Sequence, residues 1–190
     1  MEKIFIIEHL EPELYAWCMI EYKHISKIAG KENVWFTNIK SNYKDKLNKY
    51  GKVYPQSIKS MKPNDSCILD PESSVQLTPK NSKPFKYFIF GGILGDYPPR
   101  NRTKDELSSF MKNVKRFNIG KKQMSTDNAV CTVKQIINGK FLRELKFQDN
   151  VEIKINSVMS TSLPYRYNLS NGKPLISKEL IKFIKKRDKL

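Results

Sequence analysis

The sequence predicts an α/β fold in which a parallel sheet is flanked by helices. Short runs of β-branched and aromatic residues show no alternation of apolar and polar positions, which is typical of strands buried on both faces. Amphipathic segments with helical spacing lie between several of these runs. Each run ends at polar or glycine-rich residues, where turns are expected. The length of 190 residues favours a single domain.

The first part of the chain predicts a strand, a helix and a second strand. Residues 3–7 form the first apolar run. After Pro12, which is expected at the first helical position, apolar side chains recur at spacings of three and four residues until Gly30. Residues 34–36 then predict the next strand. A strand–helix–strand unit is the building block of parallel sheets.

The middle of the chain adds further strands. Residues 38–62 are polar and lysine-rich, and they predict only a helix and a loop. Residues 67–69 and 87–90 predict two strands, which end at an Asp-Pro pair and a Gly-Gly pair. Residues 114–119 predict another strand, which Gly120 ends.

Two more helices are expected beside these strands. Thr103 and Glu106 have the spacing of a capping box, which predicts a helix through about residue 111. Ser125 or Thr126 is expected to cap the second helix, whose apolar residues share one face up to an Asn-Gly stop.

The remaining residues predict a small appendage to the sheet. Residues 151–155 alternate as an edge strand, residues 163–167 are extended, and residues 177–186 predict a short basic helix. We therefore expect a core at residues 1–140 and a C-terminal extension of the same domain at residues 141–190.

The composition excludes several classes of protein. No apolar run approaches the length of about 20 residues that a membrane span needs, and the N-terminus carries no secretory signal. A soluble, cytoplasmic protein with no membrane association is expected. Cys18, Cys67 and Cys131 are far apart, without metal-ligand spacing, so we expect buried free thiols and no metal.

The net charge of +16 has two interpretations that the sequence leaves open. A positive field favours encounters with polyanions such as RNA. Alternatively, the lysines are solubilising surface residues, because they are scattered along the chain.

Chemistry is expected at the carboxyl ends of the strands, where loops and helix N-termini converge in open parallel sheets. This rule selects residues 8–11, 70–71, 91–102 and 120–127. The segment 91–102 has three glycines that allow close backbone approach to a ligand and two prolines that stiffen it. Neither the dinucleotide-binding spacing nor the P-loop spacing is present. A tight turn required by the fold alone is the other interpretation.

These segments resemble a known family. Residues 7–11, 69–71, 87–103 and 123–127 are similar to the motifs of SPOUT-type protein arginine methyltransferases, and residues 163–167 and 172–174 resemble the C-terminal extension of that family. The run GGILGD-x-PPR-x-RT is the longest and most specific of the motifs.

The resemblance implies a SPOUT fold, with a C-terminal trefoil knot, that binds S-adenosylmethionine (SAM). SAM would be held mainly by main-chain groups of two loops, which explains the glycines. The implied cofactor-binding residues are Phe90, Gly91, Gly92, Ile93, Leu94, Gly95, Ile119, Gly120, Gln123, Met124, Ser125 and Thr126. For Thr126 and Asp127, a role as the helix cap alone is the alternative.

If the acceptor is an arginine, carboxylates must grip the guanidinium and assist the loss of a proton. The candidate catalytic residues are Glu8, Glu11 and Asp96. The candidate substrate-binding residues are His9, Asp70, Arg100 and Arg102. His9 has a structural interpretation as well, and Asp96 and an arginine would alternatively pair with each other.

The resemblance implies a ribosomal protein as the substrate and a monomeric enzyme. Because ribosomal proteins are basic, a positively charged enzyme would repel its substrate. Either an acidic mouth offsets this repulsion, or the enzyme docks on ribosomal RNA; the mouth would be built from Glu8, Glu11, Glu13, Asp70 and Asp96.

Two alternative functions remain at this point. An RNA methyltransferase of the same fold would suit the charge of +16. An inactive RNA-binding or ribosome-assembly factor would keep the loops only as structure.

Overall fold

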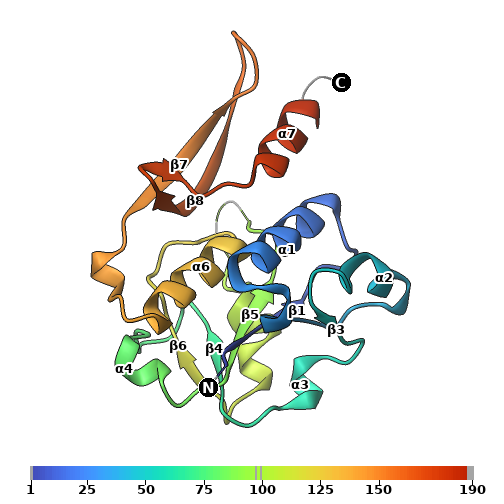
Figure 1. The fold of residues 1–190 in the computed structure, drawn as a ribbon, viewed down its shortest axis with the longest axis vertical. Helices are drawn as coiled ribbons and strands as arrows, with labels where there is room; N and C mark the ends of the chain where they lie inside the picture. The colour runs from blue at the N-terminus through green and yellow to red at the C-terminus, as the bar shows by residue number, and fades with distance from the viewer. Residues whose placement is uncertain (1, 97, 99, 188–190) are drawn as a thin grey trace.

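A six-stranded parallel sheet forms the centre of the molecule in the computed structural model, which describes residues 2–96, 98 and 100–187 (Figure 1). The strand order is β3-β2-β1-β5-β4-β6, and every pair is parallel. The strands are β1 (Ile4–His9), β2 (Val34–Thr37), β3 (Lys52–Val53), β4 (Ser66–Leu69), β5 (Tyr87–Gly92) and β6 (Lys115–Phe117). The predicted parallel sheet is confirmed.

The two central strands are longer than predicted. Glu8 and His9 continue β1, and Gly91 and Gly92 continue β5, because Glu8 pairs with Gly91 and His9 with Gly92. The sequence pattern had indicated loops at these positions. The sequence also did not predict β3, which consists of two residues beside β2.

Helices cover both faces of the sheet. Phe5, Ile7 and Phe88 pack with α1 (Ala16–Ala29) and α6 (Thr126–Ile137) on one face. The other face is covered by α3 (Ile58–Met61) and by Leu107 and Met111, which follow α5 (Arg102–Glu106). The short helices α2 (Lys44–Leu47) and α4 (Pro79–Ser82) lie in the connections. Burial on both faces explains why the strands lack alternation.

Two predicted helix starts differ from the structure, and a third is confirmed. α1 begins at Ala16 after Tyr15, so Pro12 lies ahead of the helix. Thr103 lies within the first turn of α5 and makes no capping box, because α5 begins one residue earlier and ends at Glu106. Ser125 is the N-cap residue of α6, although its hydroxyl donates to the Asp127 carboxylate at 2.6 Å.

The C-terminal residues form a separate three-stranded antiparallel sheet and a helix that project from one end of the core (Figure 1). The strands are β7 (Phe147–Lys154), β8 (Ser160–Ser170) and β9 (Lys173–Pro174), and the helix is α7 (Lys178–Arg187). Leu180 and Ile184 of α7 share a buried cluster with Trp17 and Ile20 of α1. The division at residue 140 and the trefoil knot stay predictions.

Two further sequence-based expectations concern the cysteines and the absence of a membrane span. Cys18, Cys67 and Cys131 are free, as predicted, but Cys131 is only half-buried. Burial raises the pKa of the Cys18 thiol to about 12. Among the described residues, no helix is both long and apolar enough to cross a membrane.

Candidate functional site

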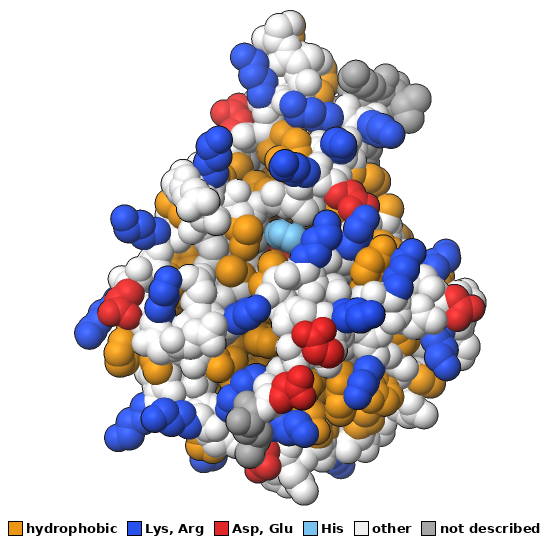
Figure 2. Space-filling view, in the orientation of Figure 1, with side chains coloured by type: hydrophobic (Ala, Val, Ile, Leu, Met, Phe, Trp, Pro, Cys, Tyr) orange, Lys and Arg blue, Asp and Glu red, His pale blue; other side chains and the backbone are white. Residues whose placement is uncertain are grey.

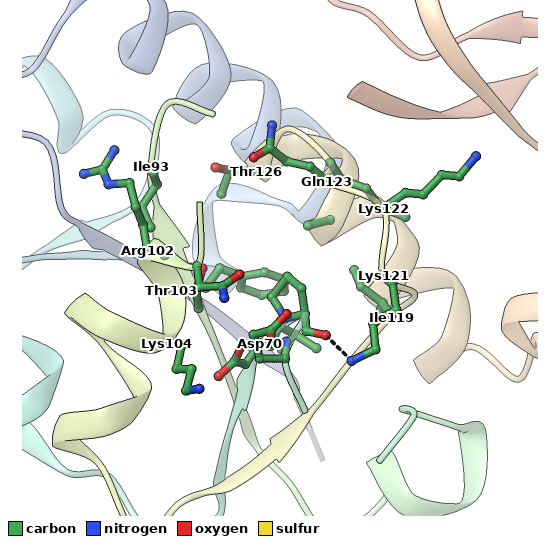
Figure 3. A pocket seen from close by; sticks show the side chains of 18 of the residues that line it. Asp70, Ile93, Arg102, Thr103, Lys104, Ile119, Lys121, Lys122, Gln123 and Thr126 are labelled. Carbon is green, nitrogen blue, oxygen red and sulfur yellow. Dashed lines mark hydrogen bonds between the residues drawn. The ribbon is translucent and has the colours of Figure 1, made fainter. Parts of the chain in front are cut away.

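A pocket opens at the carboxyl ends of β4, β5 and β6 (Figure 3). Its volume is about 170 Å³. Asp70 follows β4, Phe90 and Gly91 lie near the end of β5, and Ile119 and Gly120 follow β6; all of these residues line it. The pocket therefore lies at the edge of the sheet where loops were expected to converge.

Most of the predicted cofactor-binding residues line this pocket or the hollow beside it. Phe90, Gly91, Ile93, Ile119, Gly120, Gln123, Met124 and Thr126 line the pocket. Leu94, Gly95 and Ser125 line the neighbouring hollow, together with Met124. Gly92 lies outside both linings, and a Cβ on Gly92 would lie 2.3 Å from the hydroxyl of Tyr22. Close packing inside the fold explains this glycine.

Two other glycines shape the loops around the pocket. Gly120 has a φ of +101°, which side chains disfavour. A Cβ on Gly95 would lie 2.5 Å from the ring of Tyr165, whose hydroxyl donates to the carbonyl of Gly95 at 3.0 Å. The side-chain amide of Gln123 donates to the carbonyl of Asp96 at 3.2 Å. The loop after β5 is thus held against β8 and the loop after β6.

Arg102 fixes the other side of the same loop. Its guanidinium donates to Glu11 at 2.7 Å and to Glu106 at 2.6 Å. The Glu11 carboxylate also accepts from the amide of Leu94 at 2.8 Å. The hydrogen bond to Glu106 is the main cause that raises the pKa of Arg102. These contacts favour a positioning role for Glu11 and Arg102, in place of the predicted catalysis and substrate binding.

Asp96 and Arg100 pair at the mouth of the pocket. Both guanidinium contacts of Arg100 go to the Asp96 carboxylate, at 3.0 and 3.1 Å. This hydrogen bonding lowers the pKa of Asp96. The alternative that Asp96 pairs with an arginine is the one observed, and both residues line the pocket.

Glu8 does not line the pocket, contrary to the expectation for a catalytic carboxylate. Its side chain is 0% exposed. It accepts hydrogen bonds from the Thr37 hydroxyl at 2.5 Å, from the Ile58 amide at 2.9 Å and from the Ser57 hydroxyl. These contacts tie β1 to β2 and α3, so they favour a structural role.

His9 is also buried away from the pocket. Its Nδ1 lies 2.8 Å from the Tyr22 hydroxyl, and its buried Nε2 has no hydrogen-bond partner among the described residues. Burial is the main cause that lowers the pKa of His9. The structural interpretation of His9 fits this environment better than substrate binding does.

The predicted acidic mouth forms only in part, because Asp70 and Asp96 line the pocket whereas Glu8, Glu11 and Glu13 do not. Asp70 faces the pocket but accepts from the Ser108 hydroxyl at 2.5 Å and from the Glu72 amide at 2.9 Å. Glu13 is exposed and paired with Lys40. The pocket is also lined by several cationic residues, which are Arg100, Arg102, Lys104, Lys121 and Lys122. Figure 3 labels the last four of these. An acidic mouth that offsets repulsion of a basic substrate stays a prediction.

The neighbouring hollow contains residues that the sequence interpretation missed. It is lined by Trp17, Glu21, Leu94, Gly95, Met124, Ser125 and Tyr165. Trp17 and Glu21 lie one helical turn apart on α1, and the indole donates to the Glu21 carboxylate at 2.8 Å. In the sequence, a glutamate beside the apolar face of α1 was the feature that could have indicated this site. Tyr165 belongs to the distant extension, so no local pattern placed it here.

Glu21 is the buried carboxylate of this hollow. It is 5% exposed, and burial is the main cause that raises its pKa well above the ordinary glutamate range, with the nearby Asp127 carboxylate as the second cause. Asp127 is itself buried and lies 2.6 Å from Nδ1 of His24. Two buried acids therefore adjoin the hollow, and one of them is paired with a histidine.

Comparison with known proteins identifies the family. A family model described as "Protein arginine N-methyltransferase SFM1-like" matches residues 4–189. This chain belongs to the SFM1-like protein arginine N-methyltransferase family. The protein arginine N-methyltransferase SFM1 of Saccharomyces cerevisiae (strain ATCC 204508 / S288c) is 32% identical over 200 residues, covering 96% of this chain and 94% of the yeast protein.

Solved structures agree with this assignment. Yeast SFM1 complexed with SAM has a TM-score of 0.90 and 32% identity, covering 100% of this SFM1-like chain and 93% of that chain. A dual-specific Trm10 protein from Thermococcus kodakaraensis has a TM-score of 0.61 at 16% identity, covering 75% of this chain and 96% of that one, and shows the fold alone. The predicted SPOUT-type α/β fold is confirmed.

Proposed function

We propose that this SFM1-like chain transfers a methyl group from SAM to an arginine side chain of a ribosomal protein. The family match along residues 4–189 carries this proposal, and the pocket at the strand ends supports it. The yeast relative was solved in complex with SAM. The ribosomal substrate comes from the resemblance of the sequence motifs alone.

The residues of the pocket fit SAM chemically. Apolar side chains of Phe90, Ile93, Ile119 and Met124 offer walls for a flat adenine ring. Lys121 offers positive charge for a carboxylate, although it also donates to the carbonyl of Pro71 at 2.7 Å. The neighbouring Lys122 is paired with Asp149 at 2.7 Å. The positive φ of Gly120 turns the loop after β6 beside the pocket, where its main-chain amides and carbonyls would be available to polar atoms of the cofactor.

The protein has to align the acceptor and exclude water during this reaction. When bound, SAM supplies a methyl group whose bond to sulfur breaks with its electron pair left on sulfur. The clamp of Arg102 on Glu11 and Glu106 holds the loop after β5 over the pocket. The contacts of Tyr165 and Gln123 hold the same loop from the other side.

The basic surface supports docking on ribosomal RNA as the way to approach a basic substrate. Lys and Arg side chains are spread over the face seen in Figure 2. A ribosome-bound substrate would place the reaction in the cytoplasm. The monomeric state of the enzyme is part of this proposal because the resemblance of the sequence motifs implies it.

One experiment separates this proposal from the two alternatives. The protein is incubated with ribosomal subunits and SAM that carries a labelled methyl group. We expect label that protease removes and ribonuclease leaves in place. Label that ribonuclease removes would indicate an RNA methyltransferase, which the cationic pocket rim favours. No transfer would indicate an inactive RNA-binding or ribosome-assembly factor.

A further inference from the structure

The second hollow has the composition of a binding site for an organic cation. Trp17 and Tyr165 are half-buried aromatic residues in its lining, and Glu21 is its one lining residue with a carboxylate among the residues that the structure describes. Aromatic faces and a carboxylate attract a guanidinium through cation–π and ionic contacts. Met124 lines both this hollow and the larger pocket, so the two lie on opposite sides of one side chain.

We infer that Glu21 receives the guanidinium of the substrate arginine and accepts the proton that this group loses, with Trp17 and Tyr165 as the aromatic walls. This inference rests on the proposed arginine methylation. It assigns the acceptor side to the second hollow and the cofactor side to the pocket at the strand ends.

The chemistry of the transfer requires such an acceptor. A protonated guanidinium has no nitrogen lone pair available for attack, so one N–H proton must leave. The proton passes to a Glu21 carboxylate oxygen, and the freed nitrogen lone pair forms the bond to the methyl carbon. The carbon–sulfur bond breaks at the same time, and its electron pair stays on sulfur. Charge and atoms balance once Glu21 releases the proton to solvent.

The surroundings of Glu21 suit a proton acceptor at neutral pH. Burial and the Asp127 carboxylate raise its pKa, while the indole of Trp17 and the groups of Thr126 that face it lower it. The other titratable groups around the hollow are Cys18 and Tyr22 on α1, and Tyr165 and Tyr167 on β8. A general base is most effective when its pKa lies near the pH at which it works, and a raised carboxyl pKa lies closer to neutral pH.

A route for the proton leads away from the hollow. Asp127 lies next to Glu21 and contacts His24 at 2.6 Å. The His24 side chain is 13% exposed, so it reaches solvent. Trp17, Glu21 and His24 lie on one side of α1. This helix therefore contributes both to the wall of the second hollow and to the route by which the proton leaves it.

The other candidate carboxylates are occupied by structural contacts. Glu8 is fully buried beside β2 and α3, Glu11 binds Arg102, and Asp96 binds Arg100. Among the described residues that line the second hollow, Glu21 is the carboxylate available to a substrate.

Glu21→Gln tests the inference, with exposed Glu32→Gln as the matched control. Glutamine keeps an oxygen for the Trp17 indole but cannot accept the proton. We expect methyl transfer to fall by about 100-fold or more, which is typical for loss of a general base. SAM affinity, measured by calorimetry, should stay within about twofold. Glu32→Gln should match the wild type in both measurements.

Binding of the guanidinium is measured separately from turnover. A Trp35→Phe background leaves Trp17 as the remaining tryptophan, because the chain contains two. Titration with N-acetylarginine amide, in the presence of S-adenosylhomocysteine, should change the Trp17 fluorescence. Glu21→Gln in this background should weaken that binding by about tenfold, the equivalent of one charged hydrogen bond.

A second variant keeps the inference testable if Glu21→Gln does not fold. Asp127→Asn removes the neighbouring negative charge, so it should lower the pKa of Glu21 and move the acidic limb of the pH–rate profile to lower pH. An unmoved limb would overturn the inference.

The outcomes distinguish this inference from the proposed function. If the wild type methylates protein and the Glu21→Gln variant is equally active, the inference is wrong and the proposed function stands. Loss of SAM binding in Glu21→Gln would assign the second hollow to the cofactor and would also overturn it. No transfer to protein by the wild type would instead contradict the proposed function.

Discussion

Glu8 and Glu21 show how the contacts of a residue decide its role. Both carboxylates are almost completely buried. Glu8 accepts three hydrogen bonds from β2 and from the start of α3, and it touches neither hollow. Glu21 accepts from one indole and lines a hollow. The sequence predicted catalysis at Glu8, because a carboxylate at a strand end suggests a site, but that strand continues through it.

Replacement of Glu8 should affect stability. In Glu8→Gln the amide offers only one oxygen, so a buried donor near Ile58 or Thr37 loses its partner. We expect the free energy of unfolding to fall by about 1–3 kcal/mol. Urea unfolding measures it, with exposed Glu13→Gln as the control. Unchanged stability together with lost activity would restore the catalytic assignment of Glu8.

Replacement of Glu21 should have the opposite effect on stability at high pH. Burial raises the pKa of Glu21 in the folded protein above its pKa in the unfolded chain. The protonated carboxyl group therefore contributes stability that is fully present below the unfolded pKa and is lost as the pH rises through the folded pKa. Glutamine cannot ionise and keeps this stability. The melting temperature of Glu21→Gln should therefore exceed that of the wild type increasingly as pH rises. Parallel pH curves for the two proteins would show that burial does not raise this pKa.

At the scale of elements, the loop after β5 is built from contacts with distant segments. Glu11 follows β1, Arg102 begins α5, and Tyr165 lies in β8; each contacts the loop. The loop therefore depends on the parallel sheet and the C-terminal extension together. Its glycines alone do not determine its shape.

Arg102→Lys tests this clamp. Lysine cannot reproduce the forked contacts to Glu11 and Glu106. We expect SAM affinity to fall by about tenfold, the equivalent of one lost charged hydrogen bond. Calorimetry measures the affinity, and exposed Arg143→Lys is the control. Equal SAM affinity in the two variants would show that Arg102 does not hold the loop in place for SAM binding.

The sequence predicted the elements better than the side chains of the site. Continuous apolar runs predicted β1, β2, β4 and β5, because strands buried on both faces leave that pattern. Trp17, Glu21 and Tyr165 were missed, because tertiary contacts bring α1 and β8 together. The capping box at Thr103 failed because Arg102, one residue earlier, bridges to Glu11 and begins α5.

At the scale of the whole molecule, the charge of +16 should determine how the protein meets the ribosome. Cationic side chains line the pocket and spread over the surface (Figure 2). We expect affinity for a ribosomal RNA fragment to fall by at least about tenfold between about 50 and 200 mM salt, because counterions compete with phosphate contacts. Filter binding measures it. Salt-independent binding would indicate that the charge only keeps the protein in solution.

The central claim is that this chain methylates arginine in a ribosomal protein. Mass spectrometry of ribosomal proteins, purified after reaction of the subunits with SAM, tests it most directly. We predict that one protein gains the mass of a methyl group on an arginine side chain, and that Glu21→Gln greatly reduces this gain. Methyl groups found only on ribosomal RNA, or on residues other than arginine, would contradict the claim.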